Sequence, residues 1–439
     1  MSDTHAQTVS YVRETMLPES SPPAAEKGAI KWMRENLFSS WLNAILTLLS
    51  IYVIYLILAA IVPWLANSVW DAGSLSGCRE TLAEDGLTGH DGACFSVLSA
   101  RWHQLVFGYY PSELYWRPIL ALLIFFVGIA PILFQSVSRK LLIVTAIVPF
   151  AAFWLLWGGS IWFPLSVALG FVVGYFAMKF AGQLISPLAG IIAAIVVPIL
   201  YWLFLAGPIA GLFTNILPWA ALEPVASRAF GGFMLSVVIG LSAIILSLPL
   251  GILLALARQS DLFIIKTSAV VFIEVIRGVP LIVWLFTAQL LLNYFLPPGT
   301  NFDLTLRVII MVTLFSAAYI AEVIRGGLAA LPTGQYEGAD SLGLDYWQSM
   351  RLIILPQALK ISIPGIVNTF IGLFKDTVLV VFIGLFDPMG IAGAVRATTE
   401  WNGIYWELFI FIGLMFFIAC FSMGRYSLFL ERKLQREHR

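Results

Sequence analysis

Residues 331–357 read LPTGQYEGADSLGLDYWQSMRLIILPQ, a polar stretch between apolar segments that are each long enough to cross a bilayer. Apolar runs of about 18 or more residues recur along the chain, and one such run is sufficient for a transmembrane helix. These runs do not alternate between polar and apolar residues, as the strands of a membrane β-barrel do. The sequence therefore predicts an all-α polytopic membrane protein that holds residues 331–357 in an aqueous phase.

The composition excludes an ordinary soluble domain. Hydrophobic residues make up 60% of the chain and charged residues 11%, whereas soluble domains carry about 25% charged residues. The formal net charge is zero, but in a membrane protein the distribution of Lys and Arg is more informative than their sum.

About ten spans are expected. They cover approximately residues 41–65, 118–135, 141–157, 163–178, 184–205, 231–257, 267–294, 305–324, 361–384 and 404–427. Basic residues gather near both ends of the chain, which places both termini in the cytoplasm under the positive-inside rule. They are Arg13, Lys27, Lys31 and Arg34, and then Arg432, Lys433, Arg436 and Arg439. With ten spans, residues 331–357 also fall on the cytoplasmic side.

Changes in composition along the sequence divide the chain into four parts. They are a cytoplasmic segment (1–38), a membrane extension of about five helices with a periplasmic loop near 71–117 (39–227), five further helices (228–428) and a basic cytoplasmic tail (429–439). Cys78 and Cys94 share the loop of the extension, where a disulfide is expected if the loop is extracytoplasmic; two free thiols are the alternative. Closing a loop of this size contributes about 3 kcal/mol.

Helix signals organise the polar stretch. Thr333 is expected to cap a short helix, and Gly343 suits the left-handed residue that ends it. Asp345 and Gln348 have the spacing of a capping box, which predicts a second helix. Residues 331–357 are therefore expected to form a helix–turn–helix finger that projects into the cytoplasm.

Two further features of the finger concern its surface and its end. Gly338 and Ala339 are expected to leave a bare helix face onto which another protein can close. Pro356 is expected to hold Leu355 in extended geometry, so that the chain breaks before it re-enters the membrane.

The finger resembles the EAA signature of ABC importer permeases. The matching positions are Glu337, Gly338, Ala339, Gly343, Ile353, Leu355 and Pro356. Gly338 stands where the family usually has Ala, and is also small. In that family the finger sits in a groove of the ATP-hydrolysing subunit, so the resemblance implies an ATPase-coupling role for these residues. A solvated, capped loop is the alternative.

Other segments resemble the polar amino-acid uptake permeases within this family. They are residues 273–281 (IEVIRGVPL), 318–327 (AYIAEVIRGG) and 374–377 (FKDT). This resemblance covers about residues 228–428, which implies an ABC importer permease core. Residues 1–227 resemble the extension of the long permease in general L-amino-acid or glutamate/glutamine/aspartate/asparagine importers.

The resemblance also implies partners and a place in the cell. It implies transport of polar L-amino acids from periplasm to cytoplasm across a bacterial inner membrane. Two separate ATPase subunits, a second homologous permease that forms a heterodimer, and a periplasmic amino-acid-binding protein are expected beside membrane lipid. No nucleic acid and no cofactor are expected.

Five ionisable residues at predicted membrane depth are candidates for the substrate pathway. They are Glu274, Arg277, Glu322, Lys375 and Asp376. Buried charge is costly in a membrane and faces a partner or a water-filled route, and an amino-acid zwitterion needs an acidic and a basic partner. The alternative is pairing among themselves, such as Glu274 with Arg277 or Glu322 with Lys375.

Gly278 and Pro280 are expected to interrupt the seventh span, and a broken helix of this kind is suited to act as a gate.

No phosphate-binding G-x-x-x-x-G-K-[ST] motif is present, so the chain is not expected to hydrolyse ATP. The four histidines show no metal-ligand spacing. Two alternatives remain from the residues alone: an ion-coupled secondary amino-acid transporter that uses Glu322 or Asp376 as its proton or sodium site, and a membrane scaffold or sensor.

Overall fold

The structure is a computed structural model that describes residues 28–134, 136–218, 221–291, 294 and 303–436. Most residues in this part of the chain are helical. Its strands are the short antiparallel pair β1 (Gly159–Ser160) and β2 (Ala221–Leu222). Eight described helices are long and apolar enough to cross a membrane, or up to ten if each of two bent pairs is one span. The all-α polytopic class is confirmed.

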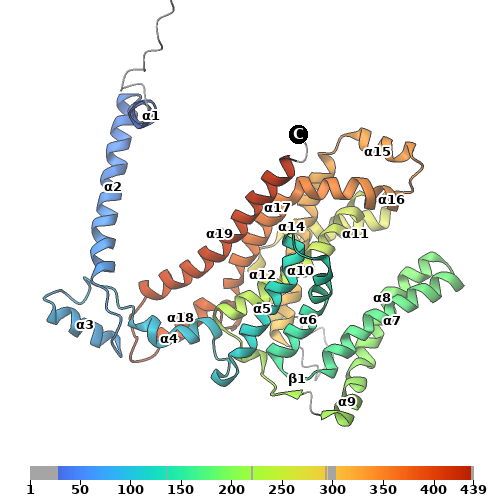
Figure 1. Cartoon of the computed structure of the whole chain (residues 1–439), viewed down its shortest axis with the longest axis horizontal. Helices are drawn as coiled ribbons and strands as arrows, with labels where there is room; N and C mark the ends of the chain where they lie inside the picture. The colour runs from blue at the N-terminus through green and yellow to red at the C-terminus, as the bar shows by residue number, and fades with distance from the viewer. Residues whose placement is uncertain (1–27, 135, 219–220, 292–293, 295–302, 437–439) are drawn as a thin grey trace, which may run out of the picture. The chain divides into compact units, whose positions relative to one another are not determined.

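The spanning helices follow the expected order (Figure 1). The eight that qualify singly are α2 (Trp41–Ala66), α5 (Trp116–Leu133), α6 (Leu142–Trp157), α7 (Trp162–Leu184), α10 (Gly232–Gln259), α14 (Leu304–Ala329), α17 (Leu355–Asp376) and α19 (Trp406–Arg436). Helix α8 (Pro187–Phe204) belongs to one of the two bent pairs. Shorter helices are α1 (Gly28–Asn36), α3 (Leu75–Glu84), α4 (Ser96–Phe107), α9 (Ala206–Ile216), α11 (Phe263–Gly278), α12 (Leu281–Phe286), α15 (Thr333–Ser341), α16 (Tyr346–Ser349) and α18 (Pro388–Arg396). The bent pairs are α8 with α9 (51°) and α11 with α12 (102°).

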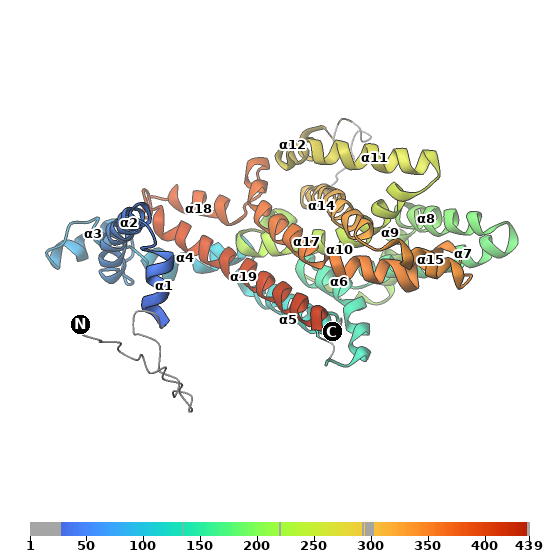
Figure 2. The same ribbon diagram turned by 90° about the horizontal axis from the view of Figure 1, so that it is seen from above.

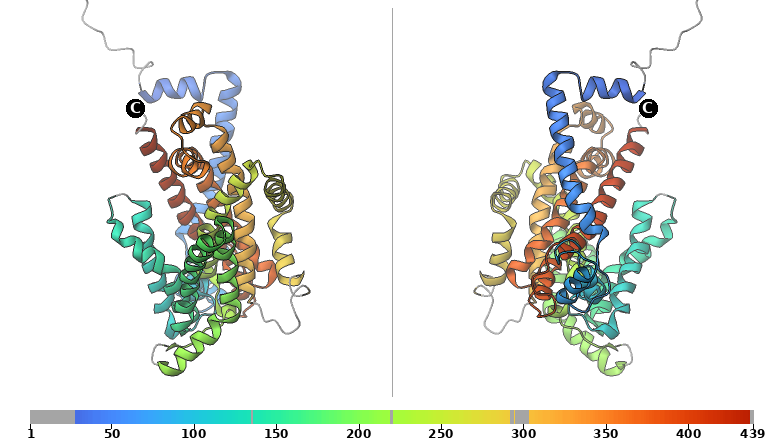
Figure 3. Two further views of the ribbon diagram at one scale, coloured as in Figure 1. Left: turned by 90° about the vertical axis from the view of Figure 1, so that its right-hand side faces the viewer. Right: turned by 90° about the vertical axis from the view of Figure 1, so that its left-hand side faces the viewer.

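The described chain forms two compact units, and the first comprises residues up to 69 together with 78–93. Its α2 has no buried residue, so its full circumference is available to lipid. The amide of Ala93 donates to the carbonyl of Trp64 at 2.9 Å, and the amide of Val69 donates to the carbonyl of Ala93 at 2.8 Å. These bonds tie the loop to the end of α2, and α1 lies across the opposite end (Figure 3).

The second unit, residues 70–77 and 94–439, is built on close packing of α10, α14 and α17 (Figure 2). Small residues allow this approach. A Cβ on Gly251 of α10 would lie 2.6 Å from Cγ2 of Ile320 on α14. A Cβ on Gly327 of α14 would lie 2.6 Å from the carbonyl oxygen of Ala358 on α17. The small residues of the sixth span therefore serve helix contact.

Part of the N-terminal extension packs on the last five spans. Phe107 at the end of α4 and Leu155 on α6 share one buried cluster with Leu235 and Ile239 of α10. The Tyr426 hydroxyl on α19 donates to the carbonyl of Leu133 on α5 at 2.6 Å. By contrast, α7, α8 and α9 pack mainly on one another. Helices α4, α5 and α6 thus share the hydrophobic core of the second unit.

Helix α4 also contacts α18 and α19 near the beginning of α10. The Cys94 amide donates to Oε1 of Glu407 at 2.9 Å, and the Glu407 side chain is buried. The Leu75 amide donates to the carbonyl of Glu400 at 2.8 Å. Cys94 and Cys78 are both disulfide-bonded, and Cys420 is a free thiol. Within the second unit, Leu75 and Cys94 are therefore held to the segment around the start of α19 by a backbone and a side-chain hydrogen bond.

Replacing Glu407 with Ala should lower the free energy of unfolding by about 1–3 kcal/mol, because the buried Cys94 amide loses its acceptor. Glu407→Gln should remain close to wild type, since the amide oxygen of glutamine can accept the same bond. Thermal unfolding in detergent checks this, with the exposed Glu113→Ala variant as the control. Equal stability of Glu407→Ala and the control would contradict the assignment.

Asp387, which lies between the last two spans, caps α18. Its Oδ1 accepts from the amide of Gly390 at 2.9 Å, and its side chain is fully buried. Burial raises the pKa of Asp387 to about 6, and the hydrogen bonds from backbone amides oppose that rise. The folded protein therefore binds this proton more tightly than the unfolded chain does.

Because the folded pKa of Asp387 is the higher one, stability should fall as pH rises between 3.8 and about 6. A shift of this size corresponds to about 3 kcal/mol. Asp387→Asn keeps an oxygen for the Gly390 amide but does not titrate, so the slope due to this group should disappear. Melting temperatures of both proteins across this pH range make the test, and identical slopes would refute it.

Candidate functional site

The first helix of the finger, α15, begins one residue earlier than a Thr333 cap requires. Its N-cap is Pro332, with φ −59° and ψ 140°, and no side chain caps it. The carbonyl of Pro332 accepts from the Gln335 amide at 3.0 Å. The prediction that Thr333 caps this helix is wrong, because Thr333 already lies inside the first turn.

The turn between the two helices is as predicted. Gly343 has φ +70°, a conformation that favours glycine. The Gly343 amide donates to the Asp340 carbonyl at 2.9 Å, and the Leu344 amide donates to the Ala339 carbonyl at 3.3 Å, which is the Schellman pattern. The capping box is also confirmed, since Asp345 and Gln348 accept from each other's amides at 2.8 and 3.2 Å.

The chain does not break at Pro356. Leu355 is helical, with φ −62° and ψ −41°, and α16 continues through a π-helical turn, Met350–Ile354, into α17. The expectation of an extended Leu355 is wrong. Pro356 lies in the first turn of α17, where the wider π-helical turn accommodates a residue that lacks an amide hydrogen. The second helix of the finger and the ninth span are therefore one continuous helix.

The finger exposes more apolar surface than the sequence suggested. Glu337 and Gly338 are exposed, but Ala339 is only 1% exposed, so it does not belong to the expected bare face. Four large apolar side chains, here called the finger tip, are exposed instead: Leu342 (73%), Tyr346 (49%), Trp347 (66%) and Leu352 (64%). The sequence analysis did not predict this exposed apolar surface, although large apolar residues in an otherwise polar stretch could have indicated it.

The base of the finger packs on the membrane helices. Ile354 is fully buried in a cluster with Leu331, Ile324 and Ala358, and Ile353 packs against the same cluster. The Gln357 amide group donates to the Gln335 side-chain oxygen at 2.9 Å, which joins α17 to α15. The base of the finger is thereby in contact with both α14 and α17.

Near this base, ionisable side chains of α10, α11 and α14 form a cluster. Glu322 contacts Arg325 at 2.5 Å, Arg258 at 3.2 Å and Arg277 at 3.7 Å. Arg258 also contacts Glu274 at 2.9 Å. We refer to these five residues as the charged cluster. Sequence reasoning missed Arg258, because a basic residue at the end of a span fits the positive-inside rule.

The pairs offered as alternatives do not form in the described part of the chain. Glu274 pairs with Arg258 rather than Arg277, and Glu322 pairs with arginines rather than Lys375. Lys375 and Asp376, at the end of α17, make no ion pair with the residues that the structure describes. They therefore lie outside the charged cluster.

The seventh span is broken at the expected residues. Helix α11 ends at Gly278, Pro280 is the N-cap of α12, and the two helix axes differ by 102°. Trp284 donates from its indole to the carbonyl of Ile276 at 3.2 Å, which satisfies one backbone group at the break. The guanidinium of Arg277 lies 5.4 Å from the ring centre of Tyr319.

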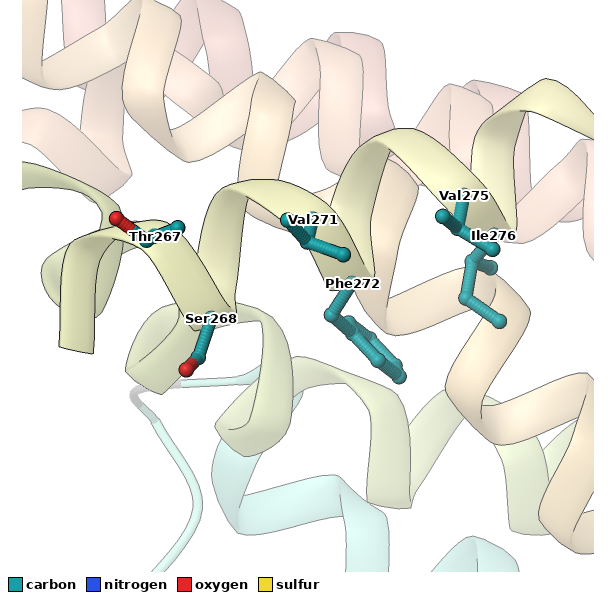
Figure 4. A pocket seen from close by; sticks show the side chains of 6 residues that line it. All are labelled: Thr267, Ser268, Val271, Phe272, Val275 and Ile276. Atoms are coloured by element: carbon teal, nitrogen blue, oxygen red, sulfur yellow. The ribbon is translucent and has the colours of Figure 1, made fainter. Parts of the chain in front are cut away.

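One face of α11 borders a hollow of about 500 Å³ (Figure 4). It is lined by Thr267, Ser268, Val271, Phe272, Val275 and Ile276. All of these lie on a single helix, so the far side of the hollow is open. Among the described residues, no group of His, Cys, Asp and Glu is arranged to hold a metal ion.

Comparison with known proteins identifies the family. Residues 247–436 match the binding-protein-dependent transport system inner membrane component. The chain is 57% identical to the glutamate/glutamine/aspartate/asparagine transport system permease protein BztC of Rhodobacter capsulatus, over 100% of both chains. It is 36% identical to the inner membrane amino-acid ABC transporter permease protein YhdY of Escherichia coli K12, over 96% of this chain and 97% of that one.

A shorter relative matches part of the chain. The glutamate/aspartate import permease protein GltK of Escherichia coli O6:H1 is 29% identical over 49% of this chain and 97% of its own length. The present chain belongs to the permease subunits of amino-acid ABC transporters. It is a multi-pass inner-membrane subunit without catalytic activity, and its partners are ATPase subunits and a substrate-binding protein. The ion-coupled transporter and the scaffold are thereby set aside.

Replacing Glu322 with Gln should destabilise the protein by about 3 kcal/mol, because three arginines lose their shared carboxylate. Glu274→Gln is the matched control. Its side chain is 54% exposed, so the loss there should stay within about 1 kcal/mol. Thermal unfolding of both variants in the same detergent measures the two losses of stability. Equal losses of stability would mean that the cluster is not centred on Glu322.

Proposed function

We propose that the finger couples ATP hydrolysis in the partner subunits to movement of this permease. The residues assigned to coupling are Glu337, Gly338, Ala339, Gly343, Ile353, Leu355 and Pro356. The finger tip carries this proposal, because four exposed large apolar side chains on one capped loop favour a protein partner. Exposed Glu337 and Gly338 would border the contact, and Ala339 would support it from within.

The path from the finger to the membrane supports this role. Since α16 continues into α17 without an extended residue, we expect a displacement of the tip to carry α17 with it. Ile354 carries the contact to Leu331, which follows α14. Glu322 lies on the same α14, so the finger is mechanically connected to the charged cluster.

For the substrate, we propose polar L-amino acids that pass from periplasm to cytoplasm along a route bordered by Glu322, Glu274, Arg277, Lys375 and Asp376. The name of the Rhodobacter capsulatus relative supports acidic amino acids and their amides. Three arginines against two glutamates leave the charged cluster with one net positive charge, which favours a carboxylate ligand. The break at Gly278 and Pro280 would act as the gate.

The proposed assembly contains two ATPase subunits, a second homologous permease and a periplasmic amino-acid-binding protein. The hollow on α11 is open on its far side, which leaves a surface on which a second permease could pack. We propose that both subunits share this type of contact in a heterodimer.

We also propose the topology and the division of the chain. Both termini face the cytoplasm, with residues 1–38 as the cytoplasmic lead-in, 39–227 as the extension, 228–428 as the permease core and 429–439 as the tail. Residues 71–117 then lie in the periplasm, where oxidising conditions favour a disulfide between Cys78 and Cys94. Their disulfide-bonded state agrees with this placement.

Charge reversal at Glu337 (Glu337→Lys) and a bulky residue at Gly343 (Gly343→Val) should abolish ATP-dependent uptake while the protein still reaches the membrane. The first repels the partner surface, and the second opposes the positive φ that orients the tip. Uptake is measured in vesicles that hold the complete transporter and ATP.

Glu84→Lys is the matched control, because Glu84 is an exposed helical glutamate far from the finger in sequence. It should transport like wild type. Wild-type uptake by Glu337→Lys and Gly343→Val, with all proteins at equal membrane levels, would refute the coupling role.

A further inference from the structure

Helix α1 of the first unit is amphipathic and has no buried residue in the described chain. At about 100° per residue, Ala29, Ile30, Trp32 and Met33 fall on one side of the helix. Lys31, Arg34 and Glu35 fall on the other. A short helix with this division favours a boundary between an apolar and an aqueous phase.

The connection to α2 fixes the orientation of α1. The amides of Leu37 and Phe38 both donate to the carbonyl of Met33, at 2.8 and 3.1 Å, and so close the end of α1. Thr47 on α2 donates from its hydroxyl to the carbonyl of Leu37 at 2.8 Å. Ser40 caps α2 by accepting from the Asn43 amide at 3.2 Å. The elbow between the helices is therefore hydrogen-bonded rather than free.

The elbow sets α1 across the end of α2 (Figure 3). Since α2 spans the membrane, α1 lies along the membrane surface from which α2 enters. Trp41, in the first turn of α2, is 77% exposed, and tryptophan favours the membrane–water interface. Trp32 of α1 is 57% exposed, which gives α1 a second tryptophan suited to that interface.

We propose that α1 is an interfacial anchor that binds the surface of an anionic bilayer. Ile30 and Met33, 58% and 44% exposed, enter the acyl-chain boundary beside Trp32. Lys31 and Arg34 point toward the headgroup and aqueous side, where their charges attract anionic lipid. Helix α2, to which the elbow joins this anchor, has no buried residue either. The anchor holds α2 at a fixed depth.

Spin labels on the two faces of α1 test the proposal in the full chain. Cys420→Ser removes the free thiol, and Met33→Cys and Arg34→Cys place labels on the apolar and the polar face. The proteins are placed in nanodiscs that contain phosphatidylglycerol. The label at position 33 should be several-fold more accessible to oxygen than to a water-soluble nickel chelate, and the label at position 34 should show the reverse.

Two outcomes would overturn the membrane contact. Equal nickel access at both positions would show a solvated helix, and shielding of position 33 from both reagents would show a protein cover. For the charge component, Lys31→Glu with Arg34→Glu should move the label at position 33 toward water in anionic discs but not in phosphatidylcholine discs. An unchanged label in anionic discs would overturn the anionic-lipid requirement. The readout does not depend on transport, so it is independent of the coupling proposal.

Discussion

The hydrocarbon core of the bilayer satisfies no backbone hydrogen bond and solvates no charge. Helical backbone meets the first demand along α2, α10, α14 and α19. Where α11 ends at Gly278, the Trp284 indole supplies one of the missing bonds. The charged cluster meets the second demand, because Glu322 pairs with Arg277 and Arg325 and shares Arg258 with Glu274.

This constraint also explains why the finger, unlike the spans, can contain a turn and exposed polar groups. Outside the bilayer, a segment is free to expose polar backbone and to end a helix with Gly343. Its base remains helical because α16 runs into α17 without an extended residue. Ile354 and Leu331 pack in one cluster with Ile320 and Ile324 of α14, the helix that carries Glu322. In the extension, α4, α5 and α6 share a hydrophobic core with α10.

Local signals in the sequence predicted local structure well. The order of the spans follows from apolar length, and Gly343 and the Asp345–Gln348 box act within a few residues of themselves. The prediction that Pro356 breaks the chain was wrong, because a π-helical turn accommodates this proline. Residue propensities do not predict such a turn. The ion-pair partners of Glu322 could not be predicted from the sequence, because they depend on how three helices pack together. Exposure at Trp347 likewise depends on which way the finger faces.

The most direct test of the account compares amino-acid uptake by two kinds of vesicle. One holds this chain alone under proton and sodium gradients, and the other holds the chain with its companion permease, ATPase subunits, ATP and loaded binding protein. Uptake should occur only in the second and should stop when ATP is replaced by a non-hydrolysable analogue. Gradient-driven uptake by the chain alone would contradict the account.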